Sequence, residues 1–174
     1  MAEKKKFFDI ETPIYLKSDI KLIAYDISSL NGRTIKIDLT RILRGKSVEA
    51  IMKVKVNDNK AQAELLKLTV MPFFIRRMMR KSISYVEDSF LAESKDCKLR
   101  IKPFMITRKK VSRAVRKALR ENGKQYLLDY VKDKNCDEIF TDTISSKLQK
   151  LLSSKMKKIY PLAFCEIREI KKLG

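Results

Sequence analysis

The chain has 174 residues, with 40 Lys and Arg against 21 Asp and Glu, which gives a formal net charge of +19 at pH 7. Hydrophobic residues make up 44% of the sequence, so a chain that is disordered throughout is excluded. Histidine is absent, and with it the commonest general base and metal ligand. Because so many cations repel one another, we expect this protein to have a polyanionic partner.

Signals for a membrane, for secretion and for disulfides are missing. No apolar run approaches the roughly 20 residues of a membrane span, and the first ten residues lack the apolar core of a secretory signal. Cys97, Cys136 and Cys165 are widely spaced without a CxxC pair, so we expect reduced thiols. The length predicts a single domain over residues 1–174, strand-rich at 7–107, helical at 108–159 and ending in a strand at 162–170.

Alternating polar and apolar residues predict strands in the first part of the chain, at 20–27, 33–39 and 48–56. Turns are expected at Ser28–Gly32 and Asn57–Asn59, whose residue types favour tight turns. The segment 61–71 suits a strand or a helix. Several short strands joined by tight turns favour a small barrel or sandwich.

Pro72 predicts the start of a short helix, because proline is well accommodated in the first helical turn. We expect Phe73, Phe74, Met78 and Met79 to lie in the core. Two further strands are predicted at 83–90 and 97–107, with a turn at 93–96 between them.

The segment 107–124, TRKKVSRAVRKALRENGK, predicts a helix with two faces. Its apolar stripe comprises Val111, Ala114, Val115, Ala118 and Leu119. Cations fill another side, and Glu121 is the one acid. Solvated helix surfaces usually mix both signs, so this pattern favours contact with a phosphate backbone.

Asn122-Gly123 predicts the end of that helix. A second helical stretch is expected at 125–132, and a third helix at about 143–159, which Pro161 ends. The alternation in 162–170 predicts the final strand.

Five blocks resemble the small-subunit ribosomal protein family shared by archaea and eukaryotes, known as the eukaryotic-type S-one or S-three-A family. In chain order they are KKFFDIETP (5–13), LNGRTIKIDLTRI (30–42), IRRMMRK (75–81), LRIKPFMITRKK (99–110) and IYPLAFCEIREIKKL (159–173). The resemblance covers essentially the whole chain and is closest to a minimal, archaeal-sized form. Here Lys110 runs almost directly into the basic helix, where family members commonly have a longer connection.

The resemblance implies an α+β fold, in which helices pack beside a small barrel-like, mostly antiparallel sheet. It also implies a structural role on the platform of the small ribosomal subunit, near the 3′ end of its RNA and the messenger exit. The expected partners are small-subunit rRNA and neighbouring ribosomal proteins, with no membrane, homo-oligomer, metal, cofactor or catalytic residue. The residues expected to bind RNA are Lys4, Lys5, Lys6, Arg33, Arg76, Arg77, Arg80, Lys81, Arg108, Lys109, Lys110, Arg113, Arg116, Lys117, Arg120, Lys124, Lys171 and Lys172.

Two other classes of function share the basic character. An RNA-processing or RNA-modifying enzyme would need clustered acids, a nucleophile or a glycine-rich phosphate loop, and the sequence shows only scattered acids and four glycines. A protein that binds an anionic membrane surface would need a larger apolar face than the Ala and Val stripe of the basic helix.

Overall fold

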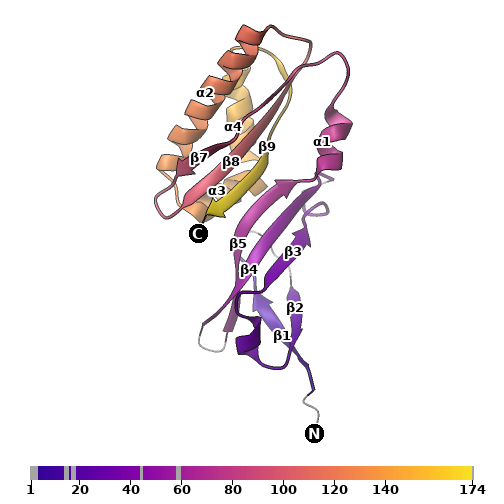
Figure 1. Cartoon of the computed structure of the whole chain (residues 1–174), viewed down its shortest axis with the longest axis vertical. Coiled ribbons are helices and arrows are strands. Elements are labelled where there is room, and N and C mark those ends of the chain that lie inside the picture. The colour runs from indigo at the N-terminus through magenta and orange to yellow at the C-terminus, as the bar shows by residue number, and fades with distance from the viewer. Residues whose placement is uncertain (1–3, 14–15, 17–18, 44, 58–59, 174) are drawn as a thin grey trace.

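The computed structural model describes residues 4–13, 16, 19–43, 45–57 and 60–173 (Figure 1). The strands are β1 (Lys6–Glu11), β2 (Ile20–Ala24), β3 (Thr34–Asp38), β4 (Val48–Asn57), β5 (Lys60–Val70), β6 (Tyr85–Glu87), β7 (Phe90–Glu93), β8 (Lys98–Thr107) and β9 (Leu162–Leu173). The helices are the 3₁₀ helix η1 (Ile27–Leu30), α1 (Pro72–Met78), α2 (Arg113–Lys132), α3 (Cys136–Ile144) and α4 (Lys147–Met156). The turn expected at Asn57–Asn59 includes residues 58 and 59, which lie outside the described ranges.

The strands form one nine-stranded sheet in the order β2-β1-β5-β9-β8-β6, with β4 also on β5, β3 on β4, and β7 on β8. All pairs are antiparallel except β1 with β5. The sheet is open and does not close into a barrel. The expected α+β class with a mostly antiparallel sheet is confirmed.

Strand β5 connects strands β1 to β4 with strands β6 to β9 in the sheet. Its full length pairs with β4, while its other edge pairs with β1 at Ala61–Gln62 and with β9 at Lys67–Thr69. The ambiguous segment 61–71 is therefore a strand, because its alternate residues, including Ala61, Ala63 and Leu65, are buried on one face of the sheet.

Helix α1 begins at Pro72 and buries Phe74 and Ile75. The expectation that Phe73 and Met79 lie in the core is wrong, since their side chains are 58% and 41% exposed. The helix ends at Met78, one residue before Met79 turns to an extended conformation, so only a narrow face reaches the core.

Helix α2 runs through Gly123, which corrects the break expected at Asn122-Gly123. A Cβ atom at Gly123 would lie 3.2 Å from Met105 Cε, so the glycine allows α2 to approach β8 closely. The buried residues of α2 are Leu119, Gly123, Leu127 and Val131. Of the expected apolar stripe, Leu119 is buried, Val111, Val115 and Ala118 are half-buried, and Ala114 is exposed.

The helix expected at about 143–159 is α4 (Lys147–Met156), which is shorter at both ends, and a separate helix, α3 (Cys136–Ile144), precedes it. Asn135 begins α3 with a capping box, in which its backbone N–H donates to Glu138 Oε2 at 3.3 Å. Ser146, with a φ of 60°, separates the two helices in the left-handed conformation. The final strand β9 extends to Leu173, so Lys171 and Lys172 belong to the sheet.

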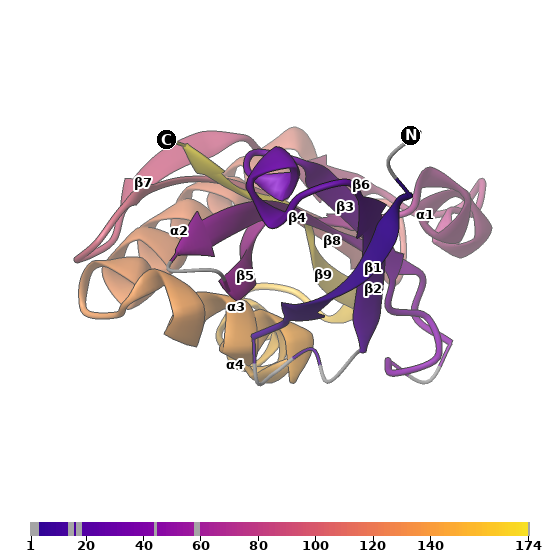
Figure 2. The same cartoon turned by 90° about the horizontal axis from the view of Figure 1, so that it is seen from below.

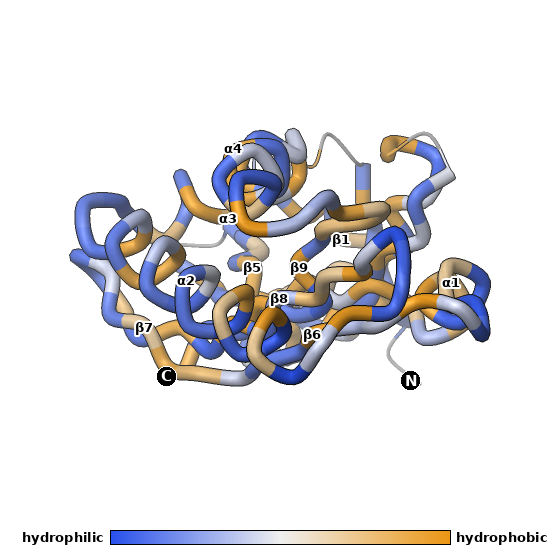
Figure 3. Tube along the Cα trace, turned by 90° about the horizontal axis from the view of Figure 1, so that it is seen from above, coloured by the Kyte–Doolittle hydropathy of each residue, from blue (hydrophilic) through white to orange (hydrophobic). Residues whose placement is uncertain are grey.

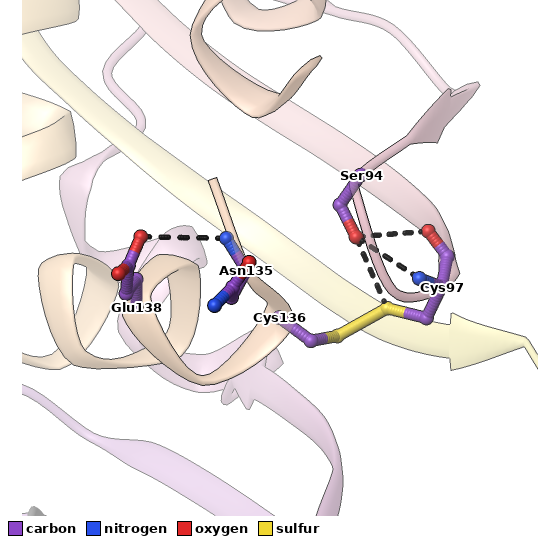
Figure 4. The surroundings of a disulfide bond; sticks show 5 residues. All are labelled: Ser94, Cys97, Asn135, Cys136 and Glu138. Carbon is purple, nitrogen blue, oxygen red and sulfur yellow. Dashed lines mark hydrogen bonds between the residues drawn. A yellow bond between two sulfur atoms is a disulfide. The ribbon is translucent and has the colours of Figure 1, made fainter. Parts of the chain in front are cut away.

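A disulfide joins Cys97 at the β7–β8 turn to Cys136 at the start of α3 (Figure 4). The expectation that all three cysteines are reduced is therefore corrected. The two residues are 39 positions apart, with Cα atoms separated by 6.5 Å, and only the fold brings them together. Ser94 fixes the turn, since its hydroxyl donates to the Cys97 carbonyl oxygen at 2.9 Å. Cys165 remains free, and burial raises the pKa of its thiol to about 12.

Helices α2, α3 and α4 lie on one side of the sheet, with α1 set apart from them (Figures 2 and 3). We call the side that α2 and α4 cover the helical face, and the other side the open face. Helix α1 packs on the upper part of the open face, where the Phe74 and Phe164 ring centroids are 6.1 Å apart. None of the helices in the described ranges has the length and apolar character needed to span a bilayer.

Candidate nucleic-acid interface

The loop between β8 and α2 holds three consecutive cations, Arg108, Lys109 and Lys110. It is fixed by Thr107, whose side chain is fully buried. The Thr107 hydroxyl donates to the Lys109 carbonyl oxygen at 2.7 Å and accepts the Ser84 N–H at 3.1 Å. The Val111 N–H donates to Ser84 Oγ at 3.2 Å. The loop is therefore ordered, and its cations project from a defined backbone.

An open hollow of about 670 Å³ lies beside this loop and is lined by Lys81, Ser82, Arg108, Lys109 and Lys110. Lys81 comes from the connection between α1 and β6, so the fold joins cations that are far apart in sequence. Helix α2 starts here with no acid in its first turn. Because the positive end of the helix dipole adds to the side-chain charges, the potential at this hollow is strongly positive.

The first half of α2 carries the row predicted from the sequence. Arg113, Lys117, Arg120 and Lys124 are all exposed. Lys117 lies 3.8 Å from Glu121, a weak exposed pair, and Lys124 Nζ lies 5.9 Å from the centre of the Phe90 ring. Arg116 differs from the others, because it is half-buried and its Nε atom is fully covered without a partner among the described residues.

The remaining predicted cations lie in four other places. Arg76, Arg77 and Arg80 are exposed on and just after α1, where the Arg77 guanidinium lies 5.2 Å from the Phe74 ring centre. Lys4, Lys5 and Lys6 are exposed at the opposite end of the molecule, near the point marked N in Figure 1. Arg33 is exposed but also structural, since its Nη1 donates to the Ile23 carbonyl oxygen at 3.1 Å. Lys171 is exposed on β9, whereas Lys172 is half-buried.

Several acids are paired inside the protein and do not neutralise these cations. Glu166 accepts from Lys46 at 2.5 Å, and Glu169 accepts from Lys102 at 3.2 Å. Burial opposes ionisation of Glu169, but the Lys102 hydrogen bond and the charge of Lys67 outweigh it and lower the pKa of this carboxyl. Among the described residues, no carboxylate lies within 4.0 Å of the cations in the 108–110 loop, of Arg113 or of Arg120.

A groove of about 730 Å³ between β1, β5 and α3 has the opposite character. It is lined by the acids Glu11, Glu64, Asp137, Glu138 and Asp142. Asp142 is bound internally, because it contacts Lys134 and accepts from the Tyr130 hydroxyl at 2.7 Å. Burial opposes its ionisation, yet these hydrogen bonds lower the pKa of the Asp142 carboxyl. Five acids that are dispersed along the sequence thus line one groove, together with Lys134 and Lys147.

Three cations that the sequence-based prediction missed lie on the open face of the sheet. Arg100 and Lys36 are exposed and Lys67 is half-buried. The alternation of Lys98, Arg100 and Lys102 along β8 is a signal that could have identified this face. The sequence predicts this strand, and its three charged residues share one side of it.

These features define a basic α+β protein whose cations are held on ordered elements, a class typical of proteins that bind nucleic acid. The chain belongs to the Ribosomal S3Ae family, whose model matches residues 1–174. This is a family of structural ribosomal proteins and not of enzymes.

Similar proteins come from several archaea. The small ribosomal subunit protein eS1 of Nanoarchaeum equitans (strain Kin4-M) is 24% identical over 184 residues, covering 97% of this chain and 93% of the relative. The protein of the same description from Methanothermobacter thermautotrophicus is 25% identical and covers 95% and 88%. That of Haloarcula marismortui is 22% identical and covers 97% and 82%. The archaeal character expected from the sequence is confirmed.

Proposed function

We propose that this protein is a structural constituent of the small ribosomal subunit, bound to small-subunit rRNA on the platform near the RNA 3′ end and the messenger exit. There it supports translation as a ribosome-bound, cytoplasmic protein, with neighbouring ribosomal proteins as further partners. Family membership and the names of the archaeal relatives support the ribosomal role. The platform position rests on the family resemblance.

One observation carries the RNA-binding part of the proposal. The 108–110 loop and the first half of α2 hold exposed cations on a fixed backbone, and little acid lies among them. Phosphates would replace the counterions of these side chains, and the released counterions would make the affinity dependent on salt. Arginine additionally offers a planar, forked donor for phosphate oxygens and can stack on bases.

The test replaces Arg113, Lys117 and Arg120 with Gln and measures affinity for an in vitro transcript of full-length small-subunit rRNA across a range of salt. We expect weaker binding and a log–log salt slope that is flatter by about two units, since each phosphate contact contributes about 0.7–0.9. The matched control removes the same charge elsewhere, with Gln at the exposed Lys132, Lys150 and Lys155. Equal slopes for wild type and the α2 variant would exclude this helix from the interface.

The position on the platform has a separate test in assembled subunits. Hydroxyl-radical footprinting with and without the protein should show protection near the 3′ region of the small-subunit RNA. Protection found only in other parts of that RNA would contradict the platform position while leaving RNA binding intact.

A further inference from the structure

One row of side chains crosses six strands on the open face of the sheet. Along the path β3, β4, β5, β9, β8 and β7, the register places one residue of each strand directly opposite a residue of the next strand. In order, this cross-strand row is Lys36, Ile51, Lys67, Lys171, Arg100 and Leu91. It therefore brings together four cations from four strands that are dispersed along the sequence.

The row points away from α2 and α4. The adjacent row, one residue along each strand, holds the apolar residues Ile37, Ala50, Leu68, Ile170, Ile101 and Phe90. All of these are buried except Ile37, which is half-buried. Because successive side chains of a strand alternate between faces, the cross-strand row must lie on the open face. Helix α1 packs on the same face. Met105 contacts α2, so the next residue, Ile106, and its register partner Phe164 lie on the open face, where Phe74 of α1 contacts Phe164.

The centre of the row opposes like charges directly. Lys67 faces Lys171, and Lys171 faces Arg100. Directly opposite residues have Cβ atoms about 4.5–5.5 Å apart, and like charges in such pairs destabilise a sheet. A polyanion bound along the row would relieve this repulsion.

Neighbouring acids reduce the repulsion between the cations of the row only in part. Glu169 lies 3.5 Å from Lys67, but it is shared with Lys102 at 3.2 Å. Among the described residues, no carboxylate lies within 4.0 Å of Lys171, Arg100 or Lys36. Leu91, which is 56% exposed, ends the row with an uncovered apolar side chain.

We propose that the cross-strand row binds the phosphate backbone of an RNA segment, on the opposite side of the sheet from α2. This inference rests on the proposed function, and it means that RNA contacts the protein on two sides. Strands lie about 4.8 Å apart, so the centre of the row spans roughly 10 Å of cationic surface. The backbone groups here are already paired within the sheet, so a partner is held by side chains alone. That favours a phosphate chain over a protein segment, which would use backbone hydrogen bonds at a sheet edge.

The test replaces Lys36, Lys171 and Arg100 with Gln in the full chain and uses the same full-length rRNA transcript. We expect the salt slope of binding to flatten by about two units relative to wild type, with less change in the Lys132, Lys150 and Lys155 control. A second readout separates binding from folding. The melting temperature of the free row variant should be equal to or higher than that of wild type, because directly opposed like charges have been removed.

The outcomes distinguish this proposal from the function on which it rests. A row variant with the wild-type slope, alongside an α2 variant with a flattened slope, would overturn the row as an RNA contact and leave the proposed function standing. Wild-type protein that does not bind the rRNA would reject both. A row variant that binds RNA normally but is depleted from assembled subunits would overturn the proposal in favour of an acidic protein neighbour.

Discussion

Gly123 shows how a single hydrogen atom in place of a side chain sets the distance between α2 and the sheet. Its position is buried, and the Met105 side chain occupies the space that a Cβ atom would approach. Helical glycine normally costs about 0.5–1 kcal/mol relative to alanine, so close packing offsets that cost here. Leu119, one turn earlier in the helix, is also buried, so the cationic first half of α2 is fixed to the core.

We expect Gly123→Leu to lower the free energy of unfolding by about 1–3 kcal/mol, because its side chain overfills the space beside Met105. Gly123→Ala should change stability much less, since better helix propensity offsets a 3.2 Å contact with the flexible end of Met105. Urea denaturation measures both. If the structure is right, Met105→Ala should restore part of the stability lost in Gly123→Leu, and a double variant no better than the single one would contradict the close approach.

The disulfide joins the β7–β8 turn of the sheet to the start of helix α3. Replacing both Cys97 and Cys136 with Ser should lower the free energy of unfolding by about 2–4 kcal/mol, because a cross-link over 39 residues restricts the unfolded chain. Urea denaturation with and without dithiothreitol measures this difference. The Cys165→Ser variant, which retains the disulfide, serves as the control.

Under reducing conditions the wild type should become as unstable as the double variant. Thiol titration of the urea-unfolded protein should find Cys165 alone before reduction. Three titratable thiols before reduction would show that the cysteines are free, as the sequence alone predicts.

Elements with strict alternation were predictable, and those set by tertiary packing were not. In β3 and β4, Ile35, Met52 and Val54 follow the expected burial because one face of each strand packs on the core. The continuity of α2 through Gly123 depends on Met105, which is 18 residues away in sequence, so local turn chemistry gave the wrong answer.

The candidate site divides in the same way. The cations of the 108–110 loop and of α2 could be identified from their density in sequence, and the structure places nearly all of them at the surface. The alternation along β8 indicates the charged side of that one strand, but the cross-strand row could not be identified, because Lys36, Lys67 and Arg100 are aligned only by strand register. The single-domain organisation and the RNA contacts of individual residues stay predictions.

At the scale of the whole molecule, the net charge of +19 is spread over both faces of the sheet and both ends of the chain. Repulsion among these cations opposes the compact state, whereas bound RNA stabilises it by mass action. Salt therefore has opposite effects on the free protein and on its complex.

We expect the melting temperature of the free protein to rise as NaCl increases from about 0.05 M to about 0.5 M, because the screening length shortens several-fold. The rise should be smaller in the Lys132, Lys150 and Lys155 control variant, which carries less charge. Over the same range the rRNA complex should dissociate. Thermal melting followed by circular dichroism measures the free protein, and a falling melting temperature would show that internal ion pairs dominate its electrostatics.

The position of β9 has a consequence for synthesis of the chain. This strand lies between β5 and β8 and pairs with both, yet it is translated after every other strand described. Until residues 162–173 leave the exit tunnel, β5 and β8 keep unpaired backbone groups along the edges that β9 later fills. Such edges can pair with other chains, so the nascent protein is vulnerable to aggregation until β9 has emerged and paired with both strands.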